Sequence, residues 1–195
     1  MSTMRNLGKW VLVVLLAGAL AGPLVALGAE FDYANFNQEV GLRFAYGKNM
    51  AKADVRLYSL LPRWGLFLIR PGQTTLGGLG LAFVVEGILS VASAEETGFE
   101  IGFTPMFQLS YPLTKGVLLF LEGGAGIISE SINSPALAHT FNFTPQVGAG
   151  VDIALAPRWG LTFAYRFRHS SNAGIYNENP AFNVNFFQMG LTYYY

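Results

Sequence analysis

The stretch WGLTFAYRFRHSS, residues 159–171, decides the fold. Large apolar side chains occupy every second position from Trp159 to Phe167, and glycine, threonine, alanine and arginine stand between them. Residues two apart on a β-strand point to the same face of the sheet, so this segment predicts a strand with one apolar and one small or polar face. His169 and Ser171 continue the apolar series without a change of phase. We therefore expect an imidazole and a hydroxyl at the end of a hydrophobic stripe.

The whole chain is more apolar than an ordinary soluble domain of its size. Of its 195 residues, 52% are hydrophobic and only 12% are charged. Residues 10–27 form one apolar run, with Arg5 and Lys9 before it and small residues after it. This order is typical of a secretory signal peptide, and we expect residues 1–29 to be cleaved. A retained N-terminal anchor is the alternative.

Residues 30–195 repeat the alternation of the opening stretch and contain no second apolar run of that length. Besides helices, only closed β-barrels satisfy all their backbone hydrogen bonds in lipid. The sequence therefore predicts an all-β domain over residues 30–195, an eight-stranded antiparallel transmembrane β-barrel. The eight predicted strands lie near residues 39–46, 57–69, 79–86, 100–109, 117–126, 141–155, 159–171 and 187–195.

The polar faces of these strands carry glycines and charges of both signs, such as Glu86 and Glu122. Small residues and balanced charges suit the interior of a narrow barrel, where side chains fill the lumen and must pair. We expect these carboxylates to be structural partners of Arg43, Arg56 and Arg166. A soluble lipocalin-like barrel is the less favoured alternative.

Two features complicate or orient the predicted barrel. Pro62 interrupts a strand, and we treat residues 57–69 as one strand with a bulge or an edge at the proline. An even strand count is expected to place both chain termini on the periplasmic side, where turns are short. The turns at residues 112–116 and 156–160 are short. The strand after the second turn then runs outward, which puts His169 and Ser171 near the outer leaflet.

His169 and Ser171 suit nucleophilic chemistry. A serine hydroxyl attacks only when a base takes its proton, and a third group usually orients that base. Ser170 has the opposite phase and is expected to face the lumen. Asn183, on the neighbouring antiparallel strand, shares the face and the end of the barrel with His169. Glu178, in the loop between the two strands, is the alternative orienting group.

The motif His169-Ser-Ser-Asn-Ala-Gly174, followed by Asn179-Pro180 and Asn183, resembles the signature of the PagL-type lipid A 3-O-deacylases, also called acyloxyacyl hydrolases. The resemblance covers the signal peptide, the barrel pattern and, most specifically, residues 166–183. It implies a serine esterase of the Gram-negative outer membrane. Such an enzyme hydrolyses an ester-linked acyl chain of lipid A in lipopolysaccharide and needs no cofactor.

The resemblance also assigns roles to residues of this chain. Ser171 matches the nucleophile and His169 matches the base, whereas Asn183 stands where the best-described relatives carry a glutamate. After the nucleophile come three residues whose backbone N–H groups are candidate donors to the oxyanion. These are Asn172, Ala173 and Gly174.

Other chemistries lack support in the sequence. There is no cysteine, and His139 has no second histidine or acidic cluster beside it, so we expect no metal site. The 12 basic and 12 acidic residues form no charge run, so we expect no nucleic-acid partner. The alternative to the esterase is a non-enzymatic small outer-membrane barrel with a structural or binding role. A palmitoyl-transfer barrel would hold an acyl chain in its lumen, and this lumen is expected to be charged.

Overall fold

The computed structural model describes residues 32–50, 55–73, 76–94, 96–132, 140–178 and 182–195. The predicted signal peptide, residues 1–29, and His139 lie outside these ranges. A 3-10 turn, η2 (Tyr33–Asn35), precedes eight strands. They are β1 (Gln38–Asn49), β2 (Arg56–Ile69), β3 (Gly80–Ser93), β4 (Thr97–Thr114), β5 (Val117–Glu130), β6 (Phe141–Ala156), β7 (Trp159–Ser170) and β8 (Phe182–Tyr194).

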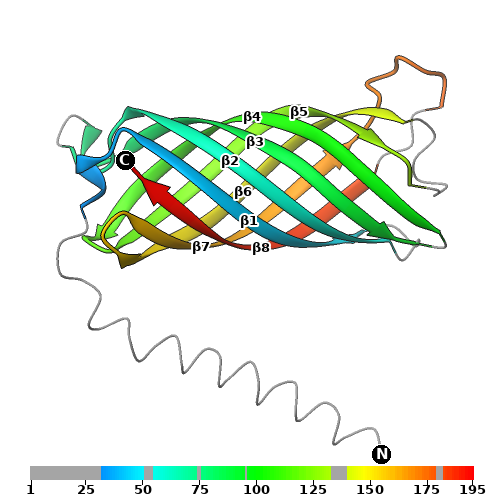
Figure 1. Cartoon of the computed structure of the whole chain (residues 1–195). Coiled ribbons are helices and arrows are strands. Elements are labelled where there is room, and N and C mark those ends of the chain that lie inside the picture. Colours follow the sequence, from blue (N-terminus) through cyan, green and yellow to red (C-terminus); the bar gives the residue numbers. More distant parts are fainter. Residues whose placement is uncertain (1–31, 51–54, 74–75, 95, 133–139, 179–181) are drawn as a thin grey trace, which may run out of the picture.

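The strands form one closed antiparallel barrel in the order of the sequence, and β1 pairs with β8 to complete it (Figure 1). This confirms the predicted all-β, eight-stranded architecture. The chain end at Tyr195 and η2 lie at one end of the barrel, and the connection between β7 and β8 lies at the other (Figure 1). Among the described residues, no helix is long and apolar enough to cross a membrane.

Strand β2 is continuous through Pro62, so the prediction of a single strand there is confirmed. The predicted position of the irregularity was wrong. The register with β3 shifts between Phe67 and Ile69, not at the proline. A Cβ on Gly87 of β3 would lie 3.1 Å from Pro62 Cγ, so this glycine leaves room for the proline ring.

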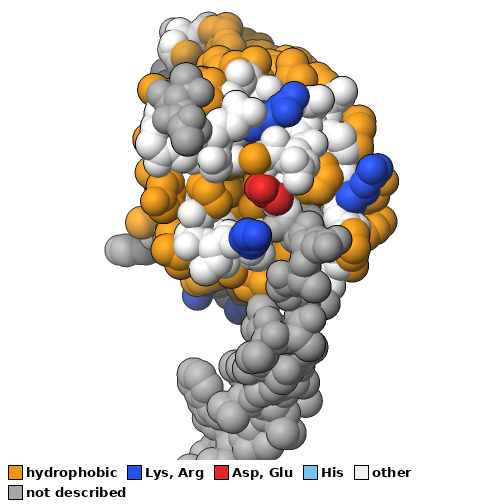
Figure 2. Space-filling view, turned by 90° about the vertical axis from the view of Figure 1, so that its left-hand side faces the viewer, with side chains coloured by type: hydrophobic (Ala, Val, Ile, Leu, Met, Phe, Trp, Pro, Cys, Tyr) orange, Lys and Arg blue, Asp and Glu red, His pale blue; other side chains and the backbone are white. Residues whose placement is uncertain are grey.

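The outer face of the barrel is apolar along its length, because the alternating large residues of every strand are exposed there. Figure 2 views the end at which η2 lies, where hydrophobic side chains gather round the circumference and side chains fill the middle. Tyr33 of η2 is only 1% exposed and donates its hydroxyl hydrogen to Asp152 of β6 over 3.1 Å. Burial and the neighbouring Asp152 carboxylate raise the pKa of Tyr33, so the hydroxyl keeps this proton.

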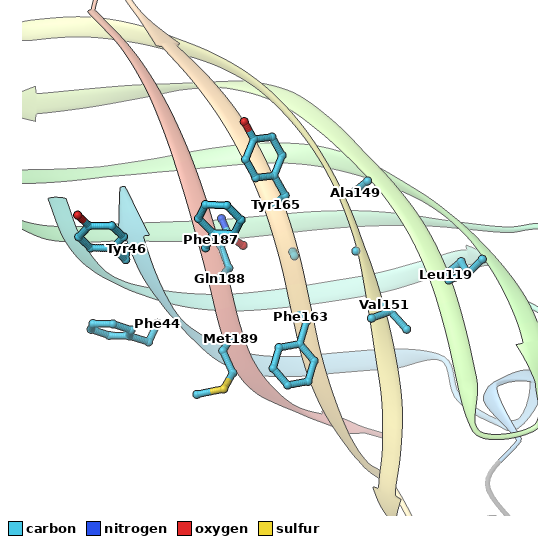
Figure 3. A pocket seen from close by; sticks show the side chains of 12 residues that line it. Phe44, Tyr46, Leu119, Ala149, Val151, Phe163, Tyr165, Phe187, Gln188 and Met189 are labelled. Atoms are coloured by element: carbon cyan, nitrogen blue, oxygen red, sulfur yellow. The ribbon is translucent and has the colours of Figure 1, made fainter. Parts of the chain in front are cut away.

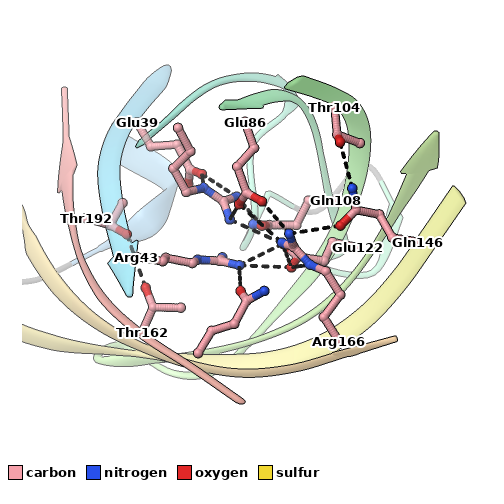
Figure 4. Close-up of polar contacts among 12 residues, drawn as sticks. Glu39, Arg43, Glu86, Thr104, Gln108, Glu122, Gln146, Thr162, Arg166 and Thr192 are labelled. Atoms are coloured by element: carbon pink, nitrogen blue, oxygen red, sulfur yellow. Dashed lines mark hydrogen bonds and ion pairs between the residues drawn. The ribbon is translucent and has the colours of Figure 1, made fainter. Parts of the chain in front are cut away.

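The centre of the lumen holds an ion-pair network around Glu122 of β5 (Figure 4). Glu122 contacts Arg43 at 2.9 Å, Arg63 at 3.2 Å, and Arg166. Arg166 also contacts Glu86. Every charge in this network is buried and paired, as a dry barrel interior requires.

Apolar clusters close the lumen on both sides of the network. One, at the η2 end, includes Tyr33, Phe67 and Tyr194, and the other, at the opposite end, includes Leu57 and Phe182. A cavity of about 10 Å³ lies between Arg166, Arg168 and Phe186, room for one water molecule at most.

The prediction that Arg56 pairs with lumen carboxylates was wrong. Arg56 is exposed, in phase with Tyr58 on the outer face of β2. The lumen cations are instead Arg43, Arg63, Arg166 and Arg168. Arg63 belongs to the Pro-Arg-Trp-Gly segment, and its phase was hidden by the uncertain path of the strand at the proline.

Candidate active site

His169 and Asn183 form the central pair of the site. They are direct cross-strand partners on β7 and β8, and His169 Nδ1 lies 2.7 Å from Asn183 Oδ1. An amide oxygen only accepts hydrogen bonds, so this contact requires the imidazole proton to be on Nδ1. The lone pair of Nε2 is then available to accept a proton from a hydroxyl.

Ser171 follows the last residue of β7. It is two residues after His169 and so continues the same face of the strand. Its backbone forms an isolated antiparallel bridge with Phe143 of β6, where Ser171 N–H donates to Phe143 O over 3.1 Å and Phe143 N–H donates to Ser171 O over 2.7 Å. The bridge fixes the Ser171 backbone on the barrel wall, and Ser171 is half-buried, as is His169. No hydrogen bond joins the side chains of these two described residues. A rotation of the serine side chain is needed to bring Oγ to Nε2.

Ser170 faces the interior of the barrel. It is 0% exposed, and its Oγ has no hydrogen-bond partner among the described residues. The two adjacent serines therefore lie on opposite faces of the barrel wall, which separates Ser170 from the His169 imidazole.

Asn172 organises the loop that follows Ser171. Its Nδ2 donates to the Glu178 backbone oxygen over 2.7 Å, and its Oδ1 accepts from Gly174 N–H over 2.9 Å. Ala173 and Gly174 have φ angles of 54° and 80°, in the left-handed region. The Gly174 N–H is thus already engaged within the loop. The Ala173 N–H has no partner among the described residues, so it is the freer of these two candidate oxyanion donors.

The Glu178 side chain is exposed and makes no contact with His169 in the described part of the chain. Its contribution to the loop is the backbone oxygen that Asn172 binds. Of the two groups considered for orienting the imidazole, the structure brings only Asn183 to His169.

Below the site, toward the middle of the barrel, a groove of about 670 Å³ runs along the outer face of β1, β8, β7 and β6 (Figure 3). The small residues Ala149 and Gly150 line it. The aromatic rings of Tyr165 and Phe187 lie beside it (Figure 3). Phe167 lies between the groove and His169 on β7. The groove faces the position of the lipid chains and can hold hydrocarbon.

Sequence reasoning missed two basic residues on this outer face, Lys48 of β1 and Arg56 of β2. They are cross-strand partners, and Lys48 also pairs with Asn185 of β8. The signal was present, since Lys48 continues the exposed series of Phe44 and Tyr46.

The fold and the site define a small outer-membrane β-barrel with a histidine-centred site on its outer wall. The family model for lipid A 3-O-deacylase (PagL) matches residues 67–192, and the chain belongs to this family. It is therefore an ester hydrolase of the lipid A deacylase type, and it is located in the Gram-negative outer membrane.

Solved structures agree on the fold. The outer-membrane enzyme PagL is 18% identical with a TM-score of 0.57, over 78% of this chain and 98% of that chain. Neisserial surface protein A is 14% identical with a TM-score of 0.55, over 81% and 97%. The attachment invasion locus protein Ail of Yersinia pestis is 12% identical with a TM-score of 0.51, over 82% and 97%. Among curated protein sequences, no match was found.

Proposed function

We propose that this barrel hydrolyses an ester-linked acyl chain of the lipid A in lipopolysaccharide, with Ser171 as nucleophile, His169 as general base and acid, and Asn183 as the orienting residue. The site lies at the end of the barrel opposite the η2 end. Because both chain termini of an even-stranded barrel are expected on the periplasmic side, this position supports a site in the outer leaflet, where lipopolysaccharide resides. The observation that carries the proposal is the contact between His169 and Asn183 on the lipid-facing side, in strand phase with Ser171.

In the first half of the reaction, Ser171 Oγ attacks the ester carbonyl carbon and its proton moves to His169 Nε2. The tetrahedral intermediate collapses, the bond between the carbonyl carbon and the sugar oxygen breaks, and Nε2 returns the proton to that oxygen. The products of this half are the deacylated glycolipid and an acyl-serine. Backbone N–H groups of the loop after Ser171 are the proposed donors to the developing oxyanion, with Ala173 as the leading one because its N–H has no partner among the described residues.

In the second half, water attacks the acyl-serine carbonyl while Nε2 takes a proton from it. The bond to Ser171 Oγ breaks, the serine recovers its proton from the imidazolium, and a free fatty acid leaves. Throughout, Asn183 Oδ1 holds Nδ1–H and keeps Nε2 directed at the reacting atoms. An amide carries no charge, so it orients the imidazole but stabilises the imidazolium less than a carboxylate does.

Mass spectrometry of lipid A before and after incubation with the purified barrel tests this proposal. The wild-type protein should remove a mass equal to one acyl chain and release the matching fatty acid. Ser171→Ala should remove none while keeping the heat-modifiable gel mobility of a folded barrel. Unchanged lipid A with folded wild-type protein would favour the non-enzymatic barrel, and full activity in Ser171→Ala would exclude this serine as the nucleophile.

A further inference from the structure

Arg168 lies directly behind the candidate site, on the lumen side of the barrel wall. It precedes His169 in β7 and is 2% exposed. Its guanidinium binds the carboxylate of Glu100 on β4, with Nη2–Oε1 and Nη1–Oε2 distances of 2.6 and 3.2 Å, and lies 5.0 Å from the centre of the Phe186 ring on β8. Two hydrogen bonds between a guanidinium and a carboxylate fix both distance and angle. The backbone next to His169 is therefore held to β4 across the lumen.

Asn142 lies behind the proposed nucleophile in the same way. It is 4% exposed on the lumen side of β6, and its Nδ2 donates to Glu130 Oε1 of β5 over 2.6 Å. The next residue, Phe143, forms the backbone bridge to Ser171. Because Ser171 lies beyond the end of β7, this bridge holds its backbone. The contact between Asn142 and Glu130 thus supports the strand on which the position of Ser171 depends.

Both contacts end on one pair of neighbouring residues. Glu100 and Glu130 are direct cross-strand partners on β4 and β5. Both are buried, and hydrogen bonds of buried groups are electrostatically stronger than those in water. The strand that carries the base and the strand that holds the nucleophile are therefore tied to one place in the barrel wall.

The separation of His169 and Ser171 depends on their backbones. In the described part of the chain, their side chains are not hydrogen-bonded to each other, and the Asn183 amide sets the direction of the imidazole but not its distance from the serine. Proton transfer requires the two heavy atoms to be within about 3 Å of each other. A displacement of about 1 Å can cost about 100-fold in rate. Contacts inside the barrel that fix the two backbones therefore bear on the reaction.

We propose that Glu100 and Glu130 are positioning residues of the reaction. Through their partners on β7 and β6, they set the distance between His169 Nε2 and Ser171 Oγ. This inference rests on the proposed function, because it takes these two atoms as base and nucleophile. The two carboxylates then have a role besides charge balance, and loss of this role lowers kcat without weakening the binding of lipid A.

Glu130 allows a test in which a conservative substitution keeps the function. Glu130→Ala removes the acceptor of the Asn142 amide, so kcat for lipid A should fall about tenfold, with KM within about twofold of the wild-type value. Glu130→Gln keeps an oxygen at the same place and should retain most of kcat. Hydrogen exchange of the Ser171 N–H, followed by NMR in micelles, gives a readout without substrate. It should be about tenfold faster in Glu130→Ala and unchanged in Glu130→Gln.

Glu100 is tested by an apolar replacement of its ion pair. Replacement of a buried ion pair by apolar residues of similar volume often leaves stability unchanged or raises it. Apolar contacts have no preferred direction. The double variant Glu100→Leu with Arg168→Met should therefore keep the unfolding temperature but lower kcat about tenfold. An ion pair with a purely structural role predicts wild-type kcat in this double variant.

Glu39→Gln is the matched control for Glu100→Gln. Each carboxylate is buried and bound by an arginine, but Glu39 binds Arg63 and lies at the start of β1, near the η2 end. Both variants should lower the unfolding temperature to a similar extent, and only Glu100→Gln should lower kcat. An equal loss of kcat in the two variants would overturn the inference.

Two further results separate this inference from the proposed function. If the wild-type barrel releases no fatty acid, but the Ser171 N–H exchanges faster in Glu130→Ala and not in Glu130→Gln, the reaction fails and the dependence of Ser171 on Glu130 stands. If the wild-type barrel releases fatty acid and kcat is unchanged in Glu130→Ala and in the apolar double variant, the reaction stands and the positioning role fails.

Discussion

His169 and Asn183 face each other across β7 and β8, with Nδ1 and Oδ1 2.7 Å apart. The pair lies on the outer face of the barrel wall, and both residues are half-buried. An uncharged amide in this position fixes the tautomer of the imidazole without adding a negative charge beside the lipid chains.

Substitutions at the orienting position should follow this geometry. Asn183→Ala removes the acceptor of Nδ1–H, and we expect deacylation to fall by about 100-fold or more. Asn183→Glu supplies a charged acceptor at the same place and should keep the activity or raise it. Glu178→Ala should leave turnover nearly unchanged, because its side chain does not contact His169. The turnover rates of the three variants, measured on one lipid A preparation, show which residue orients the imidazole.

A larger loss in Glu178→Ala than in Asn183→Ala would assign the orienting role to Glu178. Full activity in both alanine variants would indicate a Ser-His dyad.

Ser170→Ala distinguishes the two adjacent serines. Its hydroxyl is buried and has no hydrogen-bond partner among the described residues. Removing it therefore leaves no other group unsatisfied, and the unfolding temperature should be unchanged or slightly higher. Deacylation should stay close to the wild-type rate, in contrast to Ser171→Ala. A loss of activity equal to that of Ser171→Ala would contradict the strand-phase argument for the nucleophile.

Glu122→Gln should destabilise the barrel strongly. Glu122 contacts Arg43, Arg63 and Arg166 in the closed lumen, and removing one charge from a buried ion network often costs about 3 to 5 kcal/mol. The transition to the unfolded gel mobility should then occur at a lower temperature. Glu178→Gln, which makes the same chemical change at an exposed position, is the control. Lost activity with unchanged stability in Glu122→Gln would instead place this carboxylate in the reaction.

Ala149→Trp should fill part of the outer groove, which Ala149 lines. We expect KM for lipid A to rise about tenfold, roughly the effect of about ten lost dispersion contacts between the acyl chain and the protein, with little change in kcat. Ile101→Trp is the control, since Ile101 is exposed on the lipid-facing side of β4, outside the groove. A rise in KM in both variants would point to a general effect of added bulk on the outer wall.

Strand alternation predicted the barrel and the position of the site because period two is a property of the backbone. Asn183 was placed beside His169 by counting back from Tyr195, and the register of β8 agrees with this count. The site roles themselves remain predictions, since geometry alone does not measure reactivity.

The wrong predictions about the strands concern β2, where Pro62 interrupts the alternation of large and small side chains. At Pro62 the expected bulge is absent, because Gly87 on the neighbouring strand accommodates the ring, a contact that sequence spacing does not reveal. The same interruption hid the inward direction of Arg63. Arg56 was placed in the lumen on charge balance alone, although its phase with Tyr58 puts it outside. Charge balance tells which groups must pair, but strand phase tells on which side of the wall they stand.

The packed lumen and the outward site together make catalysis a two-dimensional process. Side chains close the barrel interior, so we expect substrate to reach the proposed nucleophile Ser171 by lateral diffusion within the leaflet and not through the barrel. The quantity that saturates the enzyme is then the mole fraction of lipid A among its neighbours, and dilution with inert lipid or detergent slows the reaction even when the bulk amount of substrate is constant. Both products, the deacylated glycolipid and the fatty acid, are released into the same leaflet. The lipid composition around each barrel therefore changes before that of the rest of the surface.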